Sequence, residues 1–369
     1  MTAPANPNAP SPGPGSHREP GKPPGAPAPA GGVRNRLGLA QDAYKGAKST
    51  LCQGCGHDAI TASLIRAIWE VGIEPERLAK MSGIGCSSKT PAYFSSGSWA
   101  VNACHGRMPP VATGAVVANR SLLPLGVSGD GDTASIGLGH FAHAIRRNVS
   151  LIYVIENNGV YGLTKGQFSV TADRGSRLKS GETNRADAVD CCTLALELGC
   201  GFVARSFAAD KKQLEGILKA ALSWRGTAVV DVISPCVTFN NHDGSTKSYD
   251  WGRENEKPVV EVGWVPPWET KEVDIPAGEA RSVDMPDGSR VTLRKLEADF
   301  DTSDADLARR RLTEARHKGE FLTGLFHLRP GRPTFNEGLG IVPEPLASLP
   351  ESRLRPPREA LEEAMRDLM

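Results

Sequence analysis

The stretch GDGDTASIGLGHFAHAIRRNVSLIYVIENN, residues 129–158, decides the predicted fold. It follows the strand pattern LLPLGVS and predicts, in order, a glycine turn, a helix and a second strand that ends near Asn157. Two strands that are joined by a helix in this way lie parallel in one sheet. Gly129 and Gly131 let the backbone approach a phosphate group, and the N-terminus of the following helix attracts an anion. The stretch therefore predicts a βαβ unit that binds a phosphorylated ligand.

One chemical interpretation of this unit is a dinucleotide-binding fingerprint. Gly129, Gly131 and Ala134 fit the permissive form G-x-G-x-x-A, and Glu156 stands where an acid that binds ribose is expected. The objection is electrostatic. Asp130 lies between the two glycines, and an uncompensated carboxylate there repels a pyrophosphate group by several kcal/mol.

The other interpretation is a site for Mg²⁺ and a diphosphate. Mg²⁺ prefers oxygen ligands and often bridges a few protein oxygens to phosphates, so the carboxylate of Asp130, the amide oxygen of Asn158 and the carbonyl of Val160 suit it. Asp132 and Thr133, at the start of the helix, would offer N–H donors to the phosphates. We favour this interpretation, because it gives Asp130 a role. The pattern from GDG to NN resembles the diphosphate-binding domain of thiamine diphosphate enzymes.

Alternating helix and strand patterns continue on both sides of this unit, which predicts an α/β fold with a parallel sheet and helices on both faces. The other predicted helices are HDAITASLIRAIWEVG (57–72), DAVDCCTLALELG (187–199) and DKKQLEGILKAALSW (210–224). The other predicted strands are LAKMSGIGC (78–86), GFVARSF (201–207) and TAVVDVISPC (227–236).

Polar and sulfur-bearing side chains come at the ends of the predicted strands. Since all carboxyl ends of a parallel sheet lie on one edge, where ligands bind, we expect Cys86, Asp130, Asn158 and Cys236 to meet there. The segment LCQGCGH, residues 51–57, precedes a helix that would start at the same edge. The predicted edge thus gathers metal-binding residue types that are far apart in the sequence.

Four cysteines form a candidate metal site: Cys52, Cys55, Cys86 and Cys236. A thiol–disulfide switch needs only the first two of them. Four thiolates suit structural zinc or a [4Fe–4S] cluster, and the sequence spacing leaves both open. The chemistry of thiamine diphosphate favours the cluster, because the cofactor makes an electron-rich donor from a 2-oxo acid and a cluster accepts electrons one at a time. Redox-inert zinc has no obvious use there.

The remaining cysteines have simpler interpretations. Cys191 and Cys192 lie in an apolar helical pattern and Cys200 lies at its end, so we expect them to pack in the core. Cys104 is the substitute ligand if Cys236 is not one. Eight cysteines without an apolar secretory segment argue against a disulfide scaffold and lead us to expect a cytoplasmic protein.

Composition excludes some partners. The net charge is +1, which gives no reason to expect binding to nucleic acid or to a membrane surface. No apolar run approaches the roughly 18 residues of a membrane-spanning helix. The chain is long enough for one large domain or two ordinary ones.

We expect three regions along the chain. Residues 1–38 begin with 16 Pro or Gly among the first 32 and should form a disordered tail. Residues 39–265 form the thiamine diphosphate-binding domain with the iron–sulfur site. Residues 266–369 form an irregular extension, with a hairpin that turns at Asp287-Gly288 and a helical segment at 304–326. Its Pro-rich end is an arm that wraps a partner or a poorly ordered tail.

Several blocks of sequence, in order, resemble the β subunit of the 2-oxoacid:ferredoxin oxidoreductases, most closely the 2-oxoglutarate branch. The likeness covers roughly residues 40–265, and the Pro-rich start and Glu156 depart from the usual pattern. The blocks that carry it are CQGCGH, SGIGCSSKTPAY, HGRMPPVATG, GDGD, NNGVYGLTKGQ and SPC.

The resemblance implies roles for further residues. Lys89 would bind the substrate carboxylate, and His105 and Arg107 would line the site. Charge alone also supports these roles, because cationic side chains attract an anionic substrate; the alternative is that each is an ordinary surface residue. His57 would face the cofactor or cap its helix, and Thr164 would donate to the diphosphate.

The resemblance also implies a division of labour between subunits. This chain would hold the diphosphate, Mg²⁺ and one [4Fe–4S] cluster, and a separate α subunit would bind the aminopyrimidine of thiamine diphosphate and activate it. The expected reaction converts 2-oxoglutarate and coenzyme A to succinyl-CoA and CO₂, with soluble ferredoxin as the electron acceptor. Pyruvate or a branched-chain 2-oxo acid is the alternative substrate. A zinc-stabilised NAD-binding protein and a non-redox thiamine decarboxylase subunit are the alternatives of a different class.

Overall fold

The computed structural model describes residues 32–178, 180–242, 245–266, 280–285, 288–297 and 300–366. The expected tail up to residue 31 and Asp287 of the expected hairpin turn lie outside these ranges. The chain divides into two units, Met1–Val33 and Arg34–Met369, and the elements named below belong to the second.

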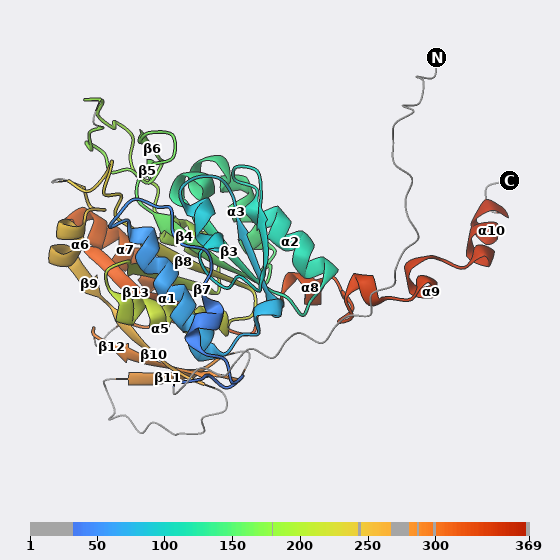
Figure 1. Cartoon of the computed structure of the whole chain (residues 1–369). Helices are drawn as coiled ribbons and strands as arrows, with labels where there is room; N and C mark the ends of the chain where they lie inside the picture. The colour runs from blue at the N-terminus through green and yellow to red at the C-terminus, as the bar shows by residue number, and fades with distance from the viewer. Residues whose placement is uncertain are drawn as a thin grey trace, which may run out of the picture. The chain divides into compact units, whose positions relative to one another are not determined.

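An eight-stranded sheet with the order β2-β1-β3-β4-β8-β7-β13-β9 forms the centre of this unit (Figure 1). The strands from β2 to β7 in that order run parallel, which confirms the predicted α/β class. The strand β13 is antiparallel to β7, and β9 is parallel to β13. The strands are β1 (Leu78–Ser82), β2 (Trp99–Asn102), β3 (Leu123–Gly129), β4 (Leu151–Asn157), β7 (Phe202–Phe207), β8 (Thr227–Ile233), β9 (Glu256–Pro258) and β13 (Phe321–Leu328).

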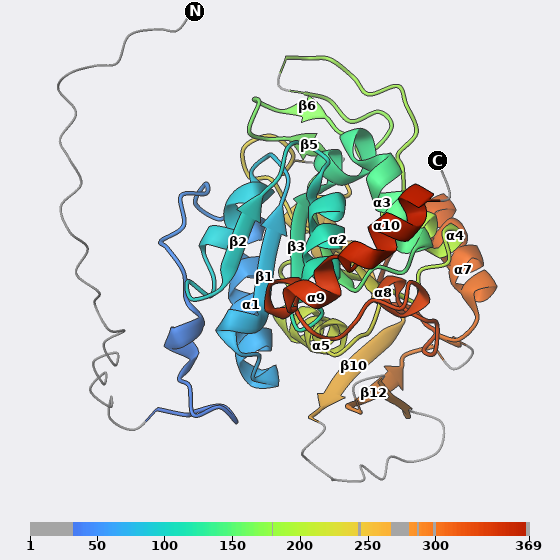
Figure 2. The same ribbon diagram turned by 90° about the vertical axis from the view of Figure 1, so that its right-hand side faces the viewer.

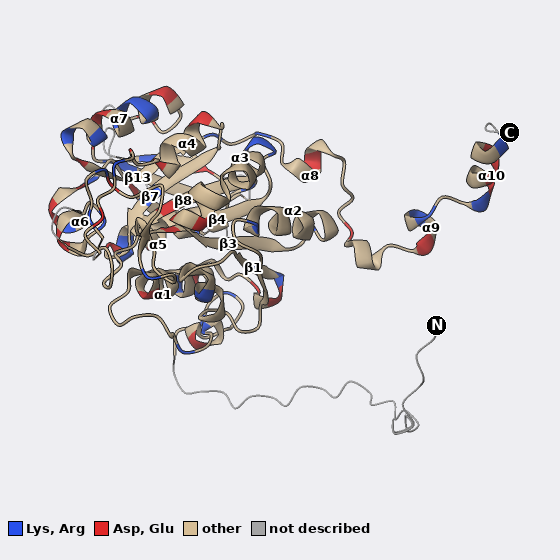
Figure 3. Cartoon of the chain, turned by 90° about the horizontal axis from the view of Figure 1, so that it is seen from above, with Lys and Arg blue, Asp and Glu red and all other residues tan. Residues whose placement is uncertain are grey.

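Helices cover both faces of this sheet, as the sequence predicts. Every residue of β4, β7 and β8 is buried, which explains why these strands are almost continuous apolar runs. In Figure 3, α1 and α5 lie on one side of the sheet, and α2, α3, α4 and α7 lie on the other. The helices are α1 (Gly56–Val71), α2 (Met108–Ala118), α3 (Leu138–Arg146), α4 (Cys191–Glu197), α5 (Lys211–Leu222), α6 (Tyr249–Asn255) and α7 (Ala305–Lys318).

The helix that the sequence predicts after GDG is divided in two. A short π-helical turn, η4 (Gly131–Ile136), precedes α3, and Gly137 separates them. A side chain on Gly137 would approach the Cα of Gly106 to 3.0 Å, so the break lets the loop after β2 pack closely against this helix. The turn η4 therefore stays beside the loops at the carboxyl edge of the sheet.

The region after residue 265 differs from the expected extension. The segment predicted as one helix at 304–326 becomes α7 and β13, because Gly319 ends the helix in the left-handed conformation and the apolar run FLTGLFHL then joins the sheet beside β7. The predicted hairpin is present as two antiparallel strands, and it pairs with a third in a small separate sheet. These strands are β10 (Val260–Val265), β11 (Ala280–Asp284) and β12 (Arg290–Lys295).

The end of the described chain packs on the main unit and then becomes exposed. Asn336, in α8 (Phe335–Gly338), donates to the carbonyl of Val116 at 2.6 Å, and Arg120 donates to the carbonyl of Ile341 at 2.5 Å. The residues of the last two helices are exposed. These helices are α9 (Glu351–Leu354) and α10 (Arg358–Arg366).

The two ends of the main sheet carry different structures. Figures 1 and 2 both show the hairpin of β5 (Val160–Tyr161) and β6 (Gln167–Phe168) at one end, and β10 and β12 of the small sheet at the other. Since β5 follows β4 directly, its end is the carboxyl edge, where the sequence predicts the site. Acidic and basic residues are mixed over α6 and α7, as the near-zero net charge leads one to expect (Figure 3). Within the described ranges, no helix has both the length and the apolar composition to cross a membrane.

Candidate active site

A cavity of about 80 Å³ opens at the carboxyl ends of β1, β3 and β4. It brings together residues from four parts of the chain that the sequence predicts to meet at this edge. Its lining also includes Glu156 and the β5–β6 hairpin residues Tyr161, Gly162 and Leu163. The sequence-predicted residues in its lining are His57, Cys86, His105, Gly129, Asp130, Gly131, Asp132, Asn158, Val160 and Thr164.

Asp130 is buried at the bottom of this site and is held by several donors. Its Oδ2 accepts from the hydroxyl of Ser169, from the hydroxyl of Thr171 at 2.5 Å and from the backbone N–H of Gly159 at 3.1 Å. Its Oδ1 accepts from the backbone N–H of Asn158 at 3.4 Å. Burial raises the pKa of the Asp130 carboxyl, and the hydroxyl hydrogen bonds lower it. One carboxylate oxygen is thus fixed by donors, and the other carries a single long contact among the described residues.

The proposed metal ligands Asn158 and Val160 belong to one tight turn at the end of β4. The Oδ1 of Asn158 accepts from the N–H of Val160 at 3.0 Å, and its backbone carbonyl accepts from the side chain of Asn240 at 2.7 Å. Gly159 between them has a φ of +75°, a conformation that favours glycine. Asp130, Asn158 and Val160 all line one cavity, and a carboxylate, an amide oxygen and a backbone carbonyl are ligand types that fit Mg²⁺.

Asp132 lines the cavity, where the sequence predicts that its backbone N–H faces a diphosphate. Its carboxylate accepts hydrogen bonds from the loops after β1 and β2 and from Ser128 in β3. Its Oδ1 accepts from the N–H of Gly106 at 2.6 Å and from the N–H of Ile84 at 3.2 Å, and it lies 2.5 Å from the Nδ1 of His105. Its Oδ2 accepts from the hydroxyl of Ser128 at 2.5 Å. Asp132 thus shapes the cavity wall and positions His105.

His57 and Glu156 form a buried pair in the cavity wall. The Nδ1 of His57 lies 2.6 Å from the hydroxyl of Ser234, and its Nε2 lies 3.7 Å from a carboxylate oxygen of Glu156. Thr90 donates to both carboxylate oxygens of Glu156, at 3.0 and 3.1 Å. Burial lowers the pKa of His57 to about 4 and raises the pKa of Glu156 well above its ordinary value. Burial thus shifts the pKa of each group in the direction of its neutral form.

The structure brings the four cysteines of the predicted cluster site to neighbouring loops. The sulfurs of Cys86 and Cys236 lie 3.4 and 3.8 Å from the position that a Cβ on Gly162 would take, so they flank the same glycine. The hydroxyl of Thr238, two residues beyond Cys236, lies 3.5 Å from the sulfur of Cys52.

The loop that carries the first two cysteines is tied to the end of β8. Cys55 caps the N-terminus of α1, and its N–H donates to the carbonyl of Cys52 at 3.0 Å. The N–H of Gly56 donates to the carbonyl of Pro235, and a side chain on Gly56 would overlap Ser234. Burial raises the pKa of the Cys55 thiol to about 12, and a bound metal reverses this effect because it binds thiolates.

The donor set at these loops fits an iron–sulfur cluster. The four thiols lie on the start of α1, the turn after β1 and the turn after β8, and Cys86 lines the same cavity as Asp130 and Asn158. Across the ranges that the structure describes, no group of three or more His, Cys, Asp or Glu side chains is arranged to hold a metal ion.

Other predicted site residues lie outside the cavity lining. Lys89 is half-buried in the turn after Cys86, and its charge lowers the pKa of that thiol against the larger effect of burial. Arg107 is exposed at the start of α2. Thr133 is fully buried, and its hydroxyl contacts Ser128 and Tyr153 rather than the cavity.

A buried polar chain that the sequence pattern does not predict lies behind Asp130. The hydroxyl oxygen of Thr171 lies 2.5 Å from a carboxylate oxygen of Asp130 and 3.0 Å from the amide oxygen of Asn157, and the amide N–H of Asn157 donates to Asp231 at 3.0 Å. Asp231 also accepts from Arg205, its register partner on β7, at 2.9 Å. One signal was available: a charged residue in the middle of TAVVDVI requires a buried partner, and Arg205 in the neighbouring strand pattern offers one.

Comparisons with known proteins agree with this geometry. Residues 83–232 match the family model of the thiamine pyrophosphate enzyme, C-terminal TPP binding domain. The chain is 41% identical over 219 residues to a 2-oxoacid:ferredoxin oxidoreductase subunit beta from a Sulfolobus species, covering 59% of this chain and 70% of that one. It is 39% identical to the 2-oxoglutarate oxidoreductase subunit KorB of Mycobacterium tuberculosis, covering 53% of this chain and 51% of that one.

A solved structure extends the likeness to the fold. It is a 2-oxoglutarate:ferredoxin oxidoreductase from Magnetococcus marinus with 2-oxoglutarate, coenzyme A and succinyl-CoA bound. The TM-score is 0.67 at 32% identity, and the likeness covers 82% of this chain and 89% of the other.

Proposed function

The chain belongs to the β subunits of the 2-oxoacid:ferredoxin oxidoreductases, and on this premise we propose that its substrate is 2-oxoglutarate. The proposed reaction is 2-oxoglutarate + CoA + 2 oxidised ferredoxin → succinyl-CoA + CO₂ + 2 reduced ferredoxin + H⁺, in which each ferredoxin takes one electron. The 2-oxoglutarate branch is supported by the names of the M. tuberculosis relative and of the M. marinus structure. Pyruvate and branched-chain 2-oxo acids remain the alternatives to be tested.

The observation that carries the proposal is the shared cavity. Cys86 lines it together with Asp130 and Asn158, so an electron acceptor held by the cysteines would adjoin a diphosphate held through Mg²⁺. In a redox enzyme this adjacency is useful, because electrons released on decarboxylation need a one-electron acceptor nearby. The dinucleotide interpretation of Gly129 to Ala134 is set aside, because the matched family model is a thiamine pyrophosphate domain.

We assign the cofactors to residues as follows. Thiamine diphosphate supplies the means to cleave the bond between the keto carbon and the carboxylate, and Gly129 and Gly131 line the place of its diphosphate. Asp130, Asn158 and the carbonyl of Val160 would hold Mg²⁺. The four thiols at positions 52, 55, 86 and 236 would hold one [4Fe–4S] cluster.

In this proposal, the chain's own side chains bind and orient the substrate. His105 is fixed by Asp132 at the cavity wall and is about one-third exposed, so it can donate a hydrogen bond to an anionic substrate. Lys89, beside Cys86, would attract the substrate carboxylate from the rim. His57 is buried in the cavity wall beside Glu156, and burial favours the neutral form of its imidazole.

An α subunit is the partner that this site needs. Ile84 and Leu163 line the cavity but are 40% and 50% exposed, and Ile136, the last residue of η4, is 46% exposed. Exposed apolar side chains at and near a cavity suit a covering protein surface. We propose that the α subunit covers this mouth and that ferredoxin receives the electrons from the cluster.

The test is activity and spectroscopy of the co-expressed α and β subunits. We expect a brown complex with broad visible absorption that bleaches when 2-oxoglutarate and coenzyme A are added without ferredoxin. A panel of 2-oxo acids should give the highest kcat/KM for 2-oxoglutarate; a higher value for pyruvate would overturn the substrate assignment. Cys236→Ala should lower the iron content, and Asp130→Ala should abolish Mg²⁺-dependent binding of thiamine diphosphate. A colourless wild-type complex that contains zinc would refute the cluster.

A further inference from the structure

Two loops that belong to different proposed sites meet at the side chain of Asn240. The turn after β4 carries Asn158 and Val160, the proposed Mg²⁺ ligands. The turn after β8 carries Cys236, a proposed cluster ligand, and reaches Asn240 four residues later. Asn240 is buried and bonded to both turns.

Asn240 donates one hydrogen bond to each of the two turns. Its backbone N–H donates to the carbonyl of Cys236 at 2.9 Å, which closes the turn that begins at the cysteine. Its side-chain N–H donates to the carbonyl of Asn158 at 2.7 Å. A Cβ on Gly159 would approach this amide nitrogen to 2.8 Å, so the contact also requires glycine at the centre of the metal-binding turn.

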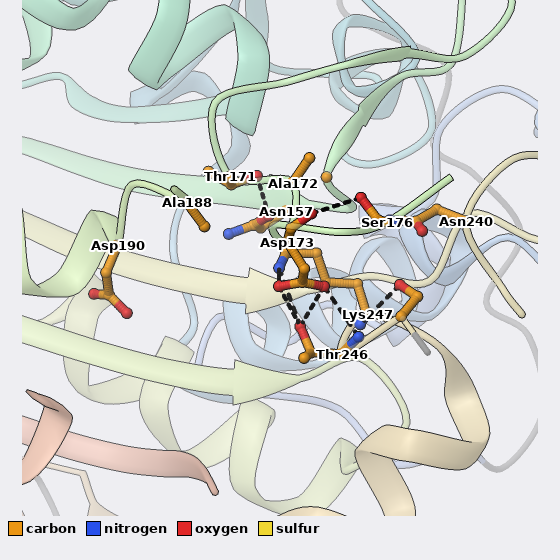
Figure 4. Close-up of polar contacts among 12 residues, drawn as sticks. Asn157, Thr171, Ala172, Asp173, Ser176, Ala188, Asp190, Asn240, Thr246 and Lys247 are labelled. Carbon is orange, nitrogen blue, oxygen red and sulfur yellow. Dashed lines mark hydrogen bonds and ion pairs between the residues drawn. The ribbon is translucent and has the colours of Figure 1, made fainter. Parts of the chain in front are cut away.

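Further contacts make the two loops one unit. The N–H of Ser234 donates to the carbonyl of Asn157 at 2.8 Å, where the adjacent strands end. Thr246 and Lys247 both bond to Asp173, at 2.9 and 3.1 Å, and Figure 4 shows these three side chains facing one another. The segment after β8 is thus fixed to the segment after β4 on both sides of Asn240.

We propose that Asn240 is a positioning residue that couples occupancy of the cluster site at Cys236 to the binding of Mg²⁺ and thiamine diphosphate at Asn158. The inference rests on the proposed function. A cluster bonded to Cys236 would further restrain the turn from 236 to 240, and through Asn240 it would restrain the carbonyl of Asn158. Without the cluster, protein contacts alone hold this turn, and the loop that carries Asn158 is less strictly fixed.

Coupling of this kind is reciprocal, which separates it from a merely structural role. If the cluster strengthens cofactor binding by some factor, the cofactor must strengthen cluster binding by the same factor. A side chain that only stabilises the fold would weaken both sites without making either depend on the other.

The first experiment measures the dissociation constant of thiamine diphosphate at saturating Mg²⁺ by quenching of tryptophan fluorescence. It uses the co-expressed αβ complex, either with its cluster or after removal of iron with a chelator. In the wild-type complex we expect removal of the cluster to raise the dissociation constant at least tenfold. In Asn240→Ala the constant is already raised with the cluster present, and its removal changes the constant less than threefold.

The second experiment measures the reciprocal effect as the rate at which a chelator bleaches the cluster. Mg²⁺ and thiamine diphosphate should slow bleaching severalfold in the wild type and have no effect in Asn240→Ala. Asn241→Ala is the matched control, because Asn241 is exposed and its side chain accepts from the N–H of Tyr249 instead. This control should behave as the wild type in both assays, and circular dichroism should show that both variants are folded.

The outcomes separate the inference from the proposed function. If cluster removal leaves the wild-type dissociation constant unchanged, or if Asn240→Ala keeps the full coupling, the inference is wrong and the proposed function stands. If the wild-type complex carries no iron or binds no thiamine diphosphate, the proposed function itself fails.

Discussion

Substitution of Asp132 tests how the loops around the cavity are held. In Asp132→Ala the N–H groups of Gly106 and Ile84 and the hydroxyl of Ser128 lose their acceptor. A buried donor without an acceptor costs about 1–3 kcal/mol. The N–H of Gly106 is buried, so the cost of leaving it without an acceptor should be at the upper end of this range. The N–H of Ile84 is part-buried, so its cost should be lower. Each 1.4 kcal/mol changes an equilibrium constant about tenfold, so loop opening should become about 5- to 150-fold more frequent.

The assay is amide hydrogen exchange followed by mass spectrometry of peptides. Peptides that contain Gly106 and Ile84 should exchange faster in Asp132→Ala by the factor given above, and a peptide from β8, which is paired on both sides, should not change. Asp132→Asn keeps an oxygen at the Oδ1 position, so its two loop peptides should exchange within a few-fold of the wild type.

One result would refute this reasoning. If Asp132→Ala has native circular dichroism and unchanged exchange at both loop peptides, then Asp132 does not hold the loops. If Asp132→Asn exchanges as fast as Asp132→Ala, the negative charge matters and the hydrogen-bond geometry does not.

Three other predictions concern stability. Burial lowers the pKa of Lys80 from 10.5 to about 8, so between these values the unfolded chain binds a proton that the folded chain has released, and stability rises with pH. Lys80→Met should remove that rise in the melting temperature, and an unchanged pH profile would contradict the assignment. Thr171→Val removes a donor from the buried Asp130 carboxylate and should lower the free energy of unfolding by about 2 kcal/mol in urea titrations, whereas Thr171→Ser should lose less than half as much. Gly46→Ala would place a Cβ into the backbone at Tyr93 and should lower the free energy of unfolding by about 1–3 kcal/mol; a melting temperature equal to that of the wild type would show that this segment can separate freely.

The sequence by itself determined the centre of the sheet and the edge where the site lies. Continuous apolar runs that alternate with helical periodicity can only pack as parallel strands covered on both faces, and β3, β4, β7 and β8 follow this rule. Polar residues just after such strands must lie at the carboxyl edge, whatever the details of packing. Asp130, Asn158 and Cys86 therefore reach one cavity as the sequence analysis expects.

Some elements were hidden because local signals pointed the other way. MPPVATGAVVA contains two prolines and a glycine and resembles a loop, yet it forms α2, because proline is tolerated in the first turn of a helix. The run FLTGLFHL continues a helical pattern without a proline, and only pairing with β7 makes it the strand β13. A segment of this kind takes its structure from the neighbour that it contacts.

The direction of each side chain at the edge was decided by the tertiary structure. Asn157 and Asn158 are adjacent, but one bonds Asp231 across the sheet and the other faces the cavity. Asp130 and Asp132 are the same residue type two positions apart, yet the carboxylate of the first accepts from the turn after β4 and that of the second accepts from the loops after β1 and β2. Sequence periodicity fixes which residues reach the edge, but hydrogen-bond partners from loops far apart in the chain fix where each polar group points, because a buried polar group must find its partner in three dimensions.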